Sequence, residues 1–190
     1  MNNPKEKKRV FLPIFIVVIM ILSTLGFIIG YSDPQTQNQN KVDYKGFEFT
    51  RTEQGTLTGT VYGKQVILIN EPSTLEDIPS DHLSLPNLQL AQKVYLTHNP
   101  NKTDAKLPIA LFEANIKPIL KYSLACAEDV LGCEKLPLKT CKDASNSTVI
   151  IRLERTNETK ITFNNNCLTI QGENLIRPTE RAILQLLGAF

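Results

Sequence analysis

The sequence predicts an α+β fold that follows an N-terminal transmembrane helix. Three features support this prediction: a long uncharged apolar run near the start, later segments in which apolar and polar residues alternate, and two segments with apolar residues at helical spacing. Hairpin-forming strands mixed with helices favour a mostly antiparallel sheet with two main helices on one face. A β-α-β piece over 93–155 can add one parallel pair, which would make the sheet mixed.

The apolar run covers residues 10–30 and contains no charged side chain. A helix of this length spans about 30 Å, the thickness of the hydrocarbon core of a bilayer. Cleaved signal peptides have a shorter apolar region that ends in an A-x-A-like site, and no alanine lies near the end of this run. We therefore expect a retained anchor, with the lipid bilayer as its partner, rather than a cleaved signal.

The charges around the run predict its orientation. Segment 1–9 holds four basic residues, whereas no Lys or Arg follows the run before Lys41. Positive residues stay on the cytoplasmic side of a membrane. We expect a single-pass protein of the cell membrane with a cytoplasmic tail at 1–9, a polar stalk at 31–45 and an extracytoplasmic α+β domain at 46–190.

Gly26 and Gly30 are separated by three residues within the apolar run. Small residues at this spacing let two membrane helices pack closely. The spacing allows a weak homodimer, and the alternative is that it arises by chance.

Strands are predicted where apolar and polar residues alternate. The expected strand ranges are 46–52, 56–62, 65–70, 93–98, 148–155, 159–164 and 167–172. A type II′ turn at Gly63-Lys64 would join the second and third of these. The last three, separated by short polar turns, read as an antiparallel meander.

Two helices are predicted from apolar spacing. The first covers 107–124, with Pro118 expected to kink or shorten it. The second follows Asn174, a candidate cap, and stops at Gly188. Between the hairpins and these helices, residues 71–87 contain three prolines and are expected to form a loop.

The four cysteines have the spacing C-x6-C-x7-C-x25-C, which is neither a zinc pattern nor a C-x-x-C redox pattern. The meander would return Cys167 to the end of the sheet where Cys141 enters, leaving Cys126 and Cys133 for each other. We therefore expect two structural disulfides, as suits an extracytoplasmic domain. His82 and His98 lie far from the cysteines in sequence and are expected to be plain polar residues, so no metal is predicted.

Three N-x-S/T sequons begin at Asn101, Asn146 and Asn157, each in a segment expected to be a turn. They predict glycosylation of an extracytoplasmic surface.

The segment "TVIIRLERTNETKITFNNNCLTIQGENLIRPTERAILQLLG" resembles a loose group of small, uncharacterised archaeal membrane-anchored proteins. These share a basic start, one membrane span, a "GFEFT"-like first strand and a closing strand–"NC"–strand–"G"–helix–"LLG". The resemblance implies a single-pass topology and assigns no role to any residue.

Catalytic motifs are missing: there is no G-x-S-x-G, H-E-x-x-H, P-loop or G-x-G-x-x-G. The acidic neighbours Glu76-Asp77 and Glu128-Asp129 are expected to be solvated. Ser80, Asp81 and His82 are adjacent in a Pro-rich predicted loop. Adjacency in sequence does not place a nucleophile and a base in catalytic geometry, so no catalytic role is predicted for them.

Charge argues against a nucleic-acid partner. The net charge is +2, but without the tail 17 basic and 18 acidic residues remain. We expect a membrane-anchored extracytoplasmic domain without a catalytic residue or cofactor that binds an envelope protein or glycan or supports a surface complex. The alternative is an envelope enzyme, either for thiol–disulfide exchange through Cys126 and Cys133 or for glycan hydrolysis.

Overall fold

The computed structural model describes residues 15–20 and 40–190, and the chain divides into two units, Met1–Asn40 and Lys41–Phe190. Residues 15–20 are helical, with exposed side chains. Among the described residues, no helix has the length and apolar character needed to cross a membrane. The predicted tail, most of the predicted span with Gly26 and Gly30, and residues 31–39 of the predicted stalk lie outside the described residues.

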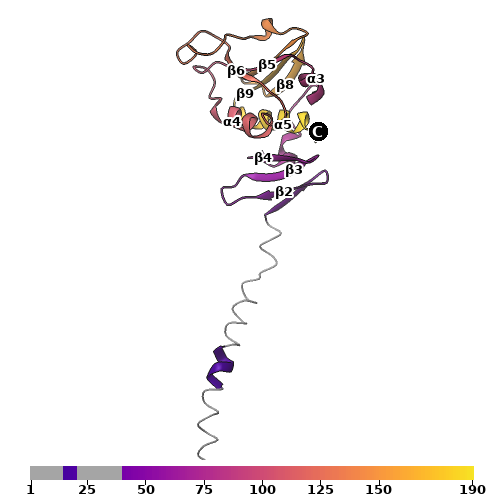
Figure 1. Cartoon of the computed structure of the whole chain (residues 1–190), viewed down its shortest axis with the longest axis vertical. Coiled ribbons are helices and arrows are strands. Elements are labelled where there is room, and N and C mark those ends of the chain that lie inside the picture. The colour runs from indigo at the N-terminus through magenta and orange to yellow at the C-terminus, as the bar shows by residue number, and fades with distance from the viewer. Residues whose placement is uncertain (1–14, 21–39) are drawn as a thin grey trace, which may run out of the picture. The chain divides into compact units, whose positions relative to one another are not determined.

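The second unit is an α+β fold with two sheets instead of one (Figure 1). Sheet A is antiparallel, with the order β1-β2-β3-β4. Its strands are β1 (Lys41–Tyr44), β2 (Phe47–Arg51), β3 (Leu57–Val61) and β4 (Lys64–Leu68). Strand β1 lies in the stretch that the sequence assigned to the stalk, so the sheet begins at Lys41 rather than near residue 46.

Sheet B is mixed, with the order β6-β5-β7-β9-β8. Its strands are β5 (Lys93–His98), β6 (Ser123–Cys126), β7 (Thr148–Arg155), β8 (Lys160–Asn164) and β9 (Cys167–Gly172). Three pairs are parallel (β5 with β6, β5 with β7, and β7 with β9), and only β8 with β9 is antiparallel. Sheet A is antiparallel as expected, and sheet B is mixed, as the β-α-β piece over 93–155 allows, but it contains three parallel pairs where the sequence predicts one.

The predicted meander is also wrong in detail. Strand β9 lies between β7 and β8, so β7 and β8 are consecutive in sequence but not paired. The outer edge of β8 is covered by the segment before α3, through the Ile161 N–H, which donates to Pro79 O, and the Asp81 N–H, which donates to Ile161 O. These bonds pair backbone groups of the edge strand β8 that would otherwise be free to pair with another strand.

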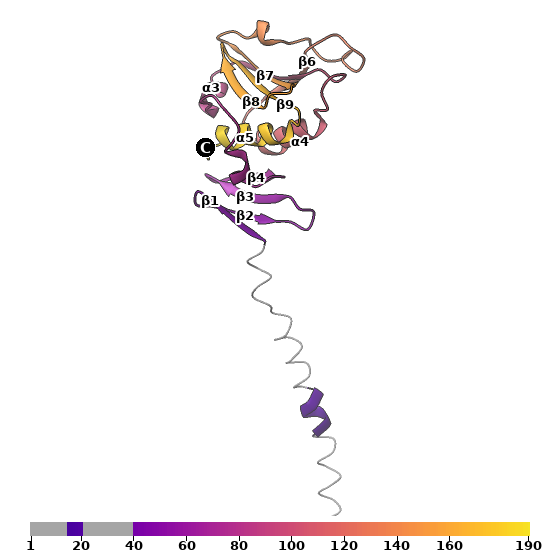
Figure 2. The ribbon, with the colours of Figure 1, turned by 180° about the vertical axis from the view of Figure 1, so that it is seen from behind.

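The main helices are α4 (Lys106–Asn115) and α5 (Ile176–Leu186). Both lie between the two sheets rather than on one outer face, as the views from opposite sides show (Figures 1 and 2). Short helical segments complete the fold: η1 (Pro72–Leu75), α3 (Leu85–Gln89) and η2 (Cys141–Asp143). Helix α4 is shorter than predicted and ends before Pro118, and the end of the predicted helix, from Ser123, belongs to β6.

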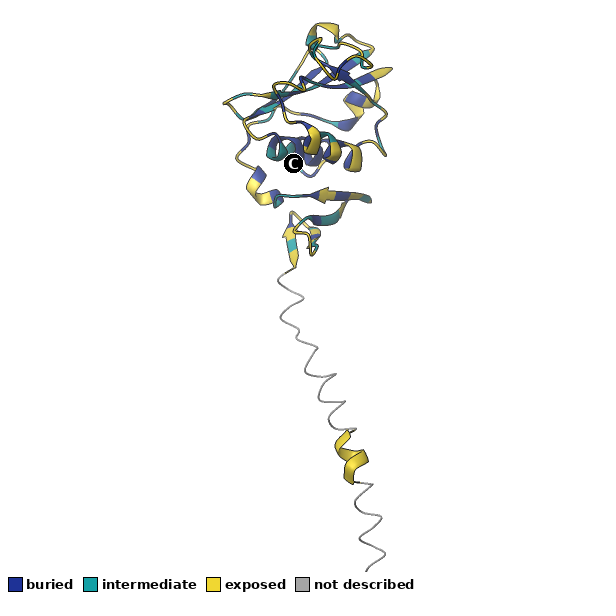
Figure 3. Ribbon diagram, turned by 90° about the vertical axis from the view of Figure 1, so that its left-hand side faces the viewer, coloured by how far each residue is buried: buried dark blue, intermediate teal, exposed yellow. Residues whose placement is uncertain are grey.

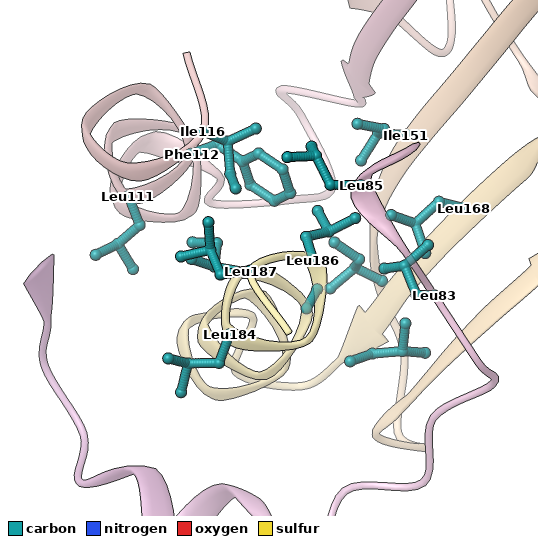
Figure 4. Packing of buried hydrophobic residues seen from close by; sticks show 14 of the residues in the cluster. Leu83, Leu85, Leu111, Phe112, Ile116, Ile151, Leu168, Leu184, Leu186 and Leu187 are labelled. Atoms are coloured by element: carbon teal, nitrogen blue, oxygen red, sulfur yellow. The ribbon is translucent and has the colours of Figure 1, made fainter. Parts of the chain in front are cut away.

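Helix α5 is buried on most of its surface because it is covered from two sides (Figure 3). The N-cap residue is Leu175, one residue after the predicted Asn174, whose side chain accepts a hydrogen bond from the Ile176 N–H at 2.9 Å. Gly188 has a φ of +85° just after the helix, as predicted. Leucines of α5 meet Phe112 and Ile116 of the α4 region and Ile151 and Leu168 of sheet B in one cluster (Figure 4).

Three tight hairpins have two-residue loops in which both residues have positive φ: Lys45-Gly46, Tyr62-Gly63 and Asn165-Asn166. This is the type I′ geometry, which matches the twist of the strands it joins. The turn predicted as type II′ at Gly63-Lys64 is therefore a type I′ turn at Tyr62-Gly63. Lys64 is not in the turn because it pairs with Val61 as the first residue of β4.

Candidate functional site

The structure contains two disulfides, Cys126–Cys133 and Cys141–Cys167, which is the pairing that the sequence predicts. Their Cα atoms lie 6.0 and 5.3 Å apart, respectively. Cys126, Cys133 and Cys167 are buried. Burial removes these sulfurs from attack by an incoming thiolate, so both bonds have the setting of structural cystines.

The three sequon asparagines, Asn101, Asn146 and Asn157, are exposed, and each lies in a turn or bend between regular elements. An exposed position leaves room for a glycan at each of them.

The acidic neighbours and the Ser80-Asp81-His82 stretch do not form a reactive group. The Asp81 carboxylate accepts from the Phe163 N–H, and the Ser80 hydroxyl donates to Gln185, so both hold the edge of β8. His82 is exposed and lines none of the pockets described below.

Glu76, Asp77 and Glu128 each have a separate partner. Tyr44 donates to Glu76, Arg177 donates to Asp77, and Lys102 donates to Glu128. The Tyr44 hydroxyl holds the pKa of Glu76 below its usual value, and the Lys102 ammonium does the same for Glu128. Carboxylates kept ionised in this way suit ion pairing rather than acid catalysis.

The parallel pairing of sheet B creates a different candidate site. Because β5, β7 and β9 run in the same direction, their carboxyl ends, at His98, Arg155 and Gly172, lie at the same end of the sheet, which we call its carboxyl edge. In open sheets with parallel strands, ligands bind at this edge.

Two depressions of about 490 and 270 Å³ lie at this edge and share Thr103, Asp104 and Arg155 in their walls. We call them together the carboxyl-edge site. The larger also contains His98 and Lys106, and the smaller also contains Leu107, Pro108, Glu173, Asn174, Leu175 and Ile176.

The loop after β5 is shaped by Asn99, which is buried. Its side-chain oxygen accepts from the Asn101 N–H at 2.9 Å, and its backbone carbonyl accepts from the Thr103 N–H at 2.9 Å. This tight turn holds Thr103 and Asp104 beside the start of α4. The local sequence Asn-Pro-Asn is turn chemistry, but the sequence does not reveal that the turn faces Arg155.

Arg155 is the charged centre of the carboxyl-edge site. Within the described ranges, it forms no ion pair and no side-chain hydrogen bond, whereas Arg152 on the same strand pairs with Glu154 at 2.7 Å. Asp104 and Glu173 also lack an ion-pair partner among the described residues. An unpaired guanidinium in a depression is available to bind a carboxylate or phosphate in a bidentate manner.

His98 is half-buried in the wall of the larger depression, and its Nδ1 has no partner among the described residues. Burial lowers its pKa, because the charged imidazolium loses solvation. At neutral pH this side chain is therefore an uncharged hydrogen-bonding group.

No group of three or more metal-ligating side chains occurs in the part of the chain that the structure describes. Comparison of the chain with protein-family models, with curated proteins and with solved structures finds no match. What the carboxyl-edge site can bind is therefore argued from its own side chains.

Sequence reasoning missed this site. The predicted crossover over 93–155 and the predicted meander over 148–172 put the ends of 93–98, 148–155 and 167–172 at one end of the sheet, but with 159–164 between 148–155 and 167–172, so that the last two ends are not neighbours. The sequence contained one signal for this site: each of three predicted strands has a charged residue at or after its end, at Asp104, Arg155 and Glu173.

Proposed function

We propose that this protein is a membrane-anchored, extracytoplasmic binding domain whose ligand occupies the carboxyl-edge site. The observation that carries the proposal is Arg155, an unpaired cation in the shared wall of two depressions at the carboxyl ends of parallel strands. The uncharged run at 10–30 with its preceding basic residues supports the anchor and its orientation. Two disulfides support an oxidising compartment.

Binding is better supported than either enzymatic alternative. Thiol–disulfide exchange needs an accessible sulfur, and Cys126 and Cys133 are 0% and 3% exposed. Glycan hydrolysis needs a carboxylic acid of raised pKa near its substrate. Burial raises the pKa of Glu180, but this carboxyl lies inside the fold and accepts hydrogen bonds from Ile69 and Asn70 at the end of β4.

Cysteine labelling of the full chain tests both parts of the proposal. Lys106 is exposed and lines the larger depression, so Lys106→Cys places a thiol at the site. Lys121→Cys, exposed beside the opposite end of β5, is the matched control. A membrane-impermeant maleimide added to intact cells should label both variants.

Occupancy should then slow labelling of Lys106→Cys in native membranes relative to the purified chain, and leave Lys121→Cys unchanged. Labelling that requires cell lysis would contradict the orientation. Equal rates for Lys106→Cys in membranes and in purified protein would contradict a ligand at the carboxyl-edge site.

A further inference from the structure

From the charges and apolar surfaces of the carboxyl-edge site we infer that its ligand is a free α-amino acid with an apolar side chain. This inference rests on the proposed binding function and adds the chemical class of the ligand. It depends on three neighbouring features of the site: the guanidinium of Arg155, two carboxylates that have no ion-pair partner among the described residues, and an apolar wall.

The cation is Arg155. It is the last residue of β7 and pairs with Gly172, the last residue of β9, which directly precedes Glu173. A planar guanidinium binds a carboxylate through two parallel hydrogen bonds.

The free carboxylates are Asp104 and Glu173, which lie with Arg155 in the wall of the smaller depression. Neither is within ion-pair distance of Arg155 or of any other described cation. An ammonium group between them would gain charge-assisted hydrogen bonds without displacing an existing partner. A simple anion at Arg155 would instead meet two like charges, which disfavours it.

The apolar wall is formed by Leu107, Pro108, Leu175 and Ile176. Leu107 is 44% exposed, so part of this wall is open to solvent. Covering this surface with an aliphatic side chain would stabilise the complex by about 25 cal/mol for each Å² buried. The volume of about 270 Å³ is below that of sites for drug-sized ligands, so it suits a small molecule.

Carboxylate, ammonium and aliphatic group on one small molecule define an apolar α-amino acid. The two charged groups are tested separately by blocking each of them on leucine. N-acetyl-leucine lacks the ammonium, leucine methyl ester lacks the carboxylate, and leucyl-leucine separates the two groups along a peptide.

Isothermal titration calorimetry of the full-length protein in detergent micelles at pH 7 measures these four ligands. Leucine should bind, and the three modified ligands should each bind at least tenfold more weakly, which corresponds to about 1.4 kcal/mol for each lost charged contact. No heat with leucine up to millimolar concentration would overturn the inference, as would equal affinity for N-acetyl-leucine or tighter binding of leucyl-leucine.

Variants locate the contacts. Arg155→Gln should weaken leucine binding at least tenfold, and Arg152→Gln, which removes an already paired arginine on the same strand, should not change it. The double variant Asp104→Asn/Glu173→Gln should weaken leucine binding while improving binding of N-acetyl-leucine, because the repulsion is gone. An equal effect of the two arginine variants would overturn the assignment.

Failure of this inference differs from failure of the proposed function. If leucine does not bind but Lys106→Cys is still protected in native membranes, the site has a ligand of another class. The amino-acid inference is then wrong, and the binding function stands.

Discussion

Sheet A and sheet B are held in the fold in different ways. Sheet A is a ladder of neighbouring strands, each antiparallel to the one before it in sequence, and it contains no cysteine. In sheet B the spatial order of the strands differs from their order in the sequence, and each disulfide has one cysteine on a strand of this sheet. Sheet B, whose strands pair over long sequence distances, is linked by disulfides. Sheet A, whose strands pair with their sequence neighbours, attaches to the helices through buried hydrogen bonds.

The attachment of sheet A runs through the backbone of β4. The Asn115 side chain of α4 accepts from the Ile67 N–H at 2.7 Å and donates to the Ile67 carbonyl at 3.0 Å, as a neighbouring strand would. Two residues further along, the Glu180 carboxylate of α5 accepts from the Ile69 N–H and from Asn70. Buried polar side chains of the helices therefore close an edge strand that would otherwise be unpaired.

The largest expected effect comes from the covalent links of sheet B. The double variant Cys141→Ala/Cys167→Ala opens a bridge between residues 26 apart in sequence and should cost about 3.5 kcal/mol. This corresponds to a fall in melting temperature of about 7–14 °C for a domain of this size. Cys126→Ala/Cys133→Ala opens a bridge between residues only 7 apart and should cost about 2.5 kcal/mol.

Scanning calorimetry of the full chain measures both double variants. A larger loss for Cys126→Ala/Cys133→Ala would show that the length of the closed loop does not decide the stabilisation. Peptide mapping without reduction should recover one fragment that links Cys141 to Cys167.

A smaller effect is expected from the noncovalent attachment of sheet A. Asn115→Ala removes three hydrogen bonds, including the one from the Asn115 amide to the Leu111 carbonyl at 2.8 Å, and should cost about 2 kcal/mol. Hydrogen exchange at the Ile67 amide should accelerate, whereas Asn87→Ala, at an exposed position of α3, should change neither quantity. Unchanged exchange at Ile67 would contradict the role of Asn115 in closing the β4 edge.

The second attachment should depend on pH. Burial raises the pKa of Glu180 above its ordinary value despite the hydrogen bonds that it accepts. The unfolded chain therefore loses the proton first as pH rises, so the contribution of Glu180 to stability is complete below about pH 4.5 and decreases up to the folded pKa. Glu180→Gln does not titrate, so in urea unfolding the stability of the native chain minus that of the variant should fall as the pH rises from about 4.5 through the folded-state pKa of Glu180.

A constant difference across that range would mean that the pKa of Glu180 is the same in the folded and unfolded chains. The other titrating groups occur in both proteins and cancel in the difference.

The smallest effects are expected in the hairpins, which occur in both sheets. Lys45 and Asn165 occupy the same first loop position, with φ of +51° and +49°, but asparagine tolerates this conformation better than lysine. Lys45→Asn in sheet A should stabilise the fold by about 0.5 kcal/mol, and Asn165→Lys in sheet B should destabilise it by about the same amount. Effects of equal sign in urea unfolding would show that side-chain contacts, not the loop conformation, decide these positions.

The comparison of the sheets also explains which predictions from sequence hold. Strands β2, β3 and β4, the start of α4 near Pro108, and the ends of α5 at Asn174 and Gly188 depend on residues close in sequence, through alternation, turn formation and capping. The disulfide Cys141–Cys167 was predicted although the meander is wrong. Strand β9 runs in the same direction as β7 whether it lies beside β7 or beyond β8, so its first residue reaches the same end of the sheet either way.

Only the tertiary structure decides the split into two sheets, the insertion of β9 between β7 and β8, and the burial of α5 between the sheets. Each of these depends on contacts between residues far apart in sequence, whose local patterns are the same for either arrangement. Glu180 is one example. The spacing of apolar residues predicts an amphipathic helix around it, but the sequence does not indicate that residues at the end of β4 donate hydrogen bonds to its carboxylate. The carboxyl-edge site has the same origin: Asp104, Arg155 and Glu173 follow three separate strands, and the insertion of β9 beside β7 makes Arg155 a direct neighbour of Gly172, which precedes Glu173.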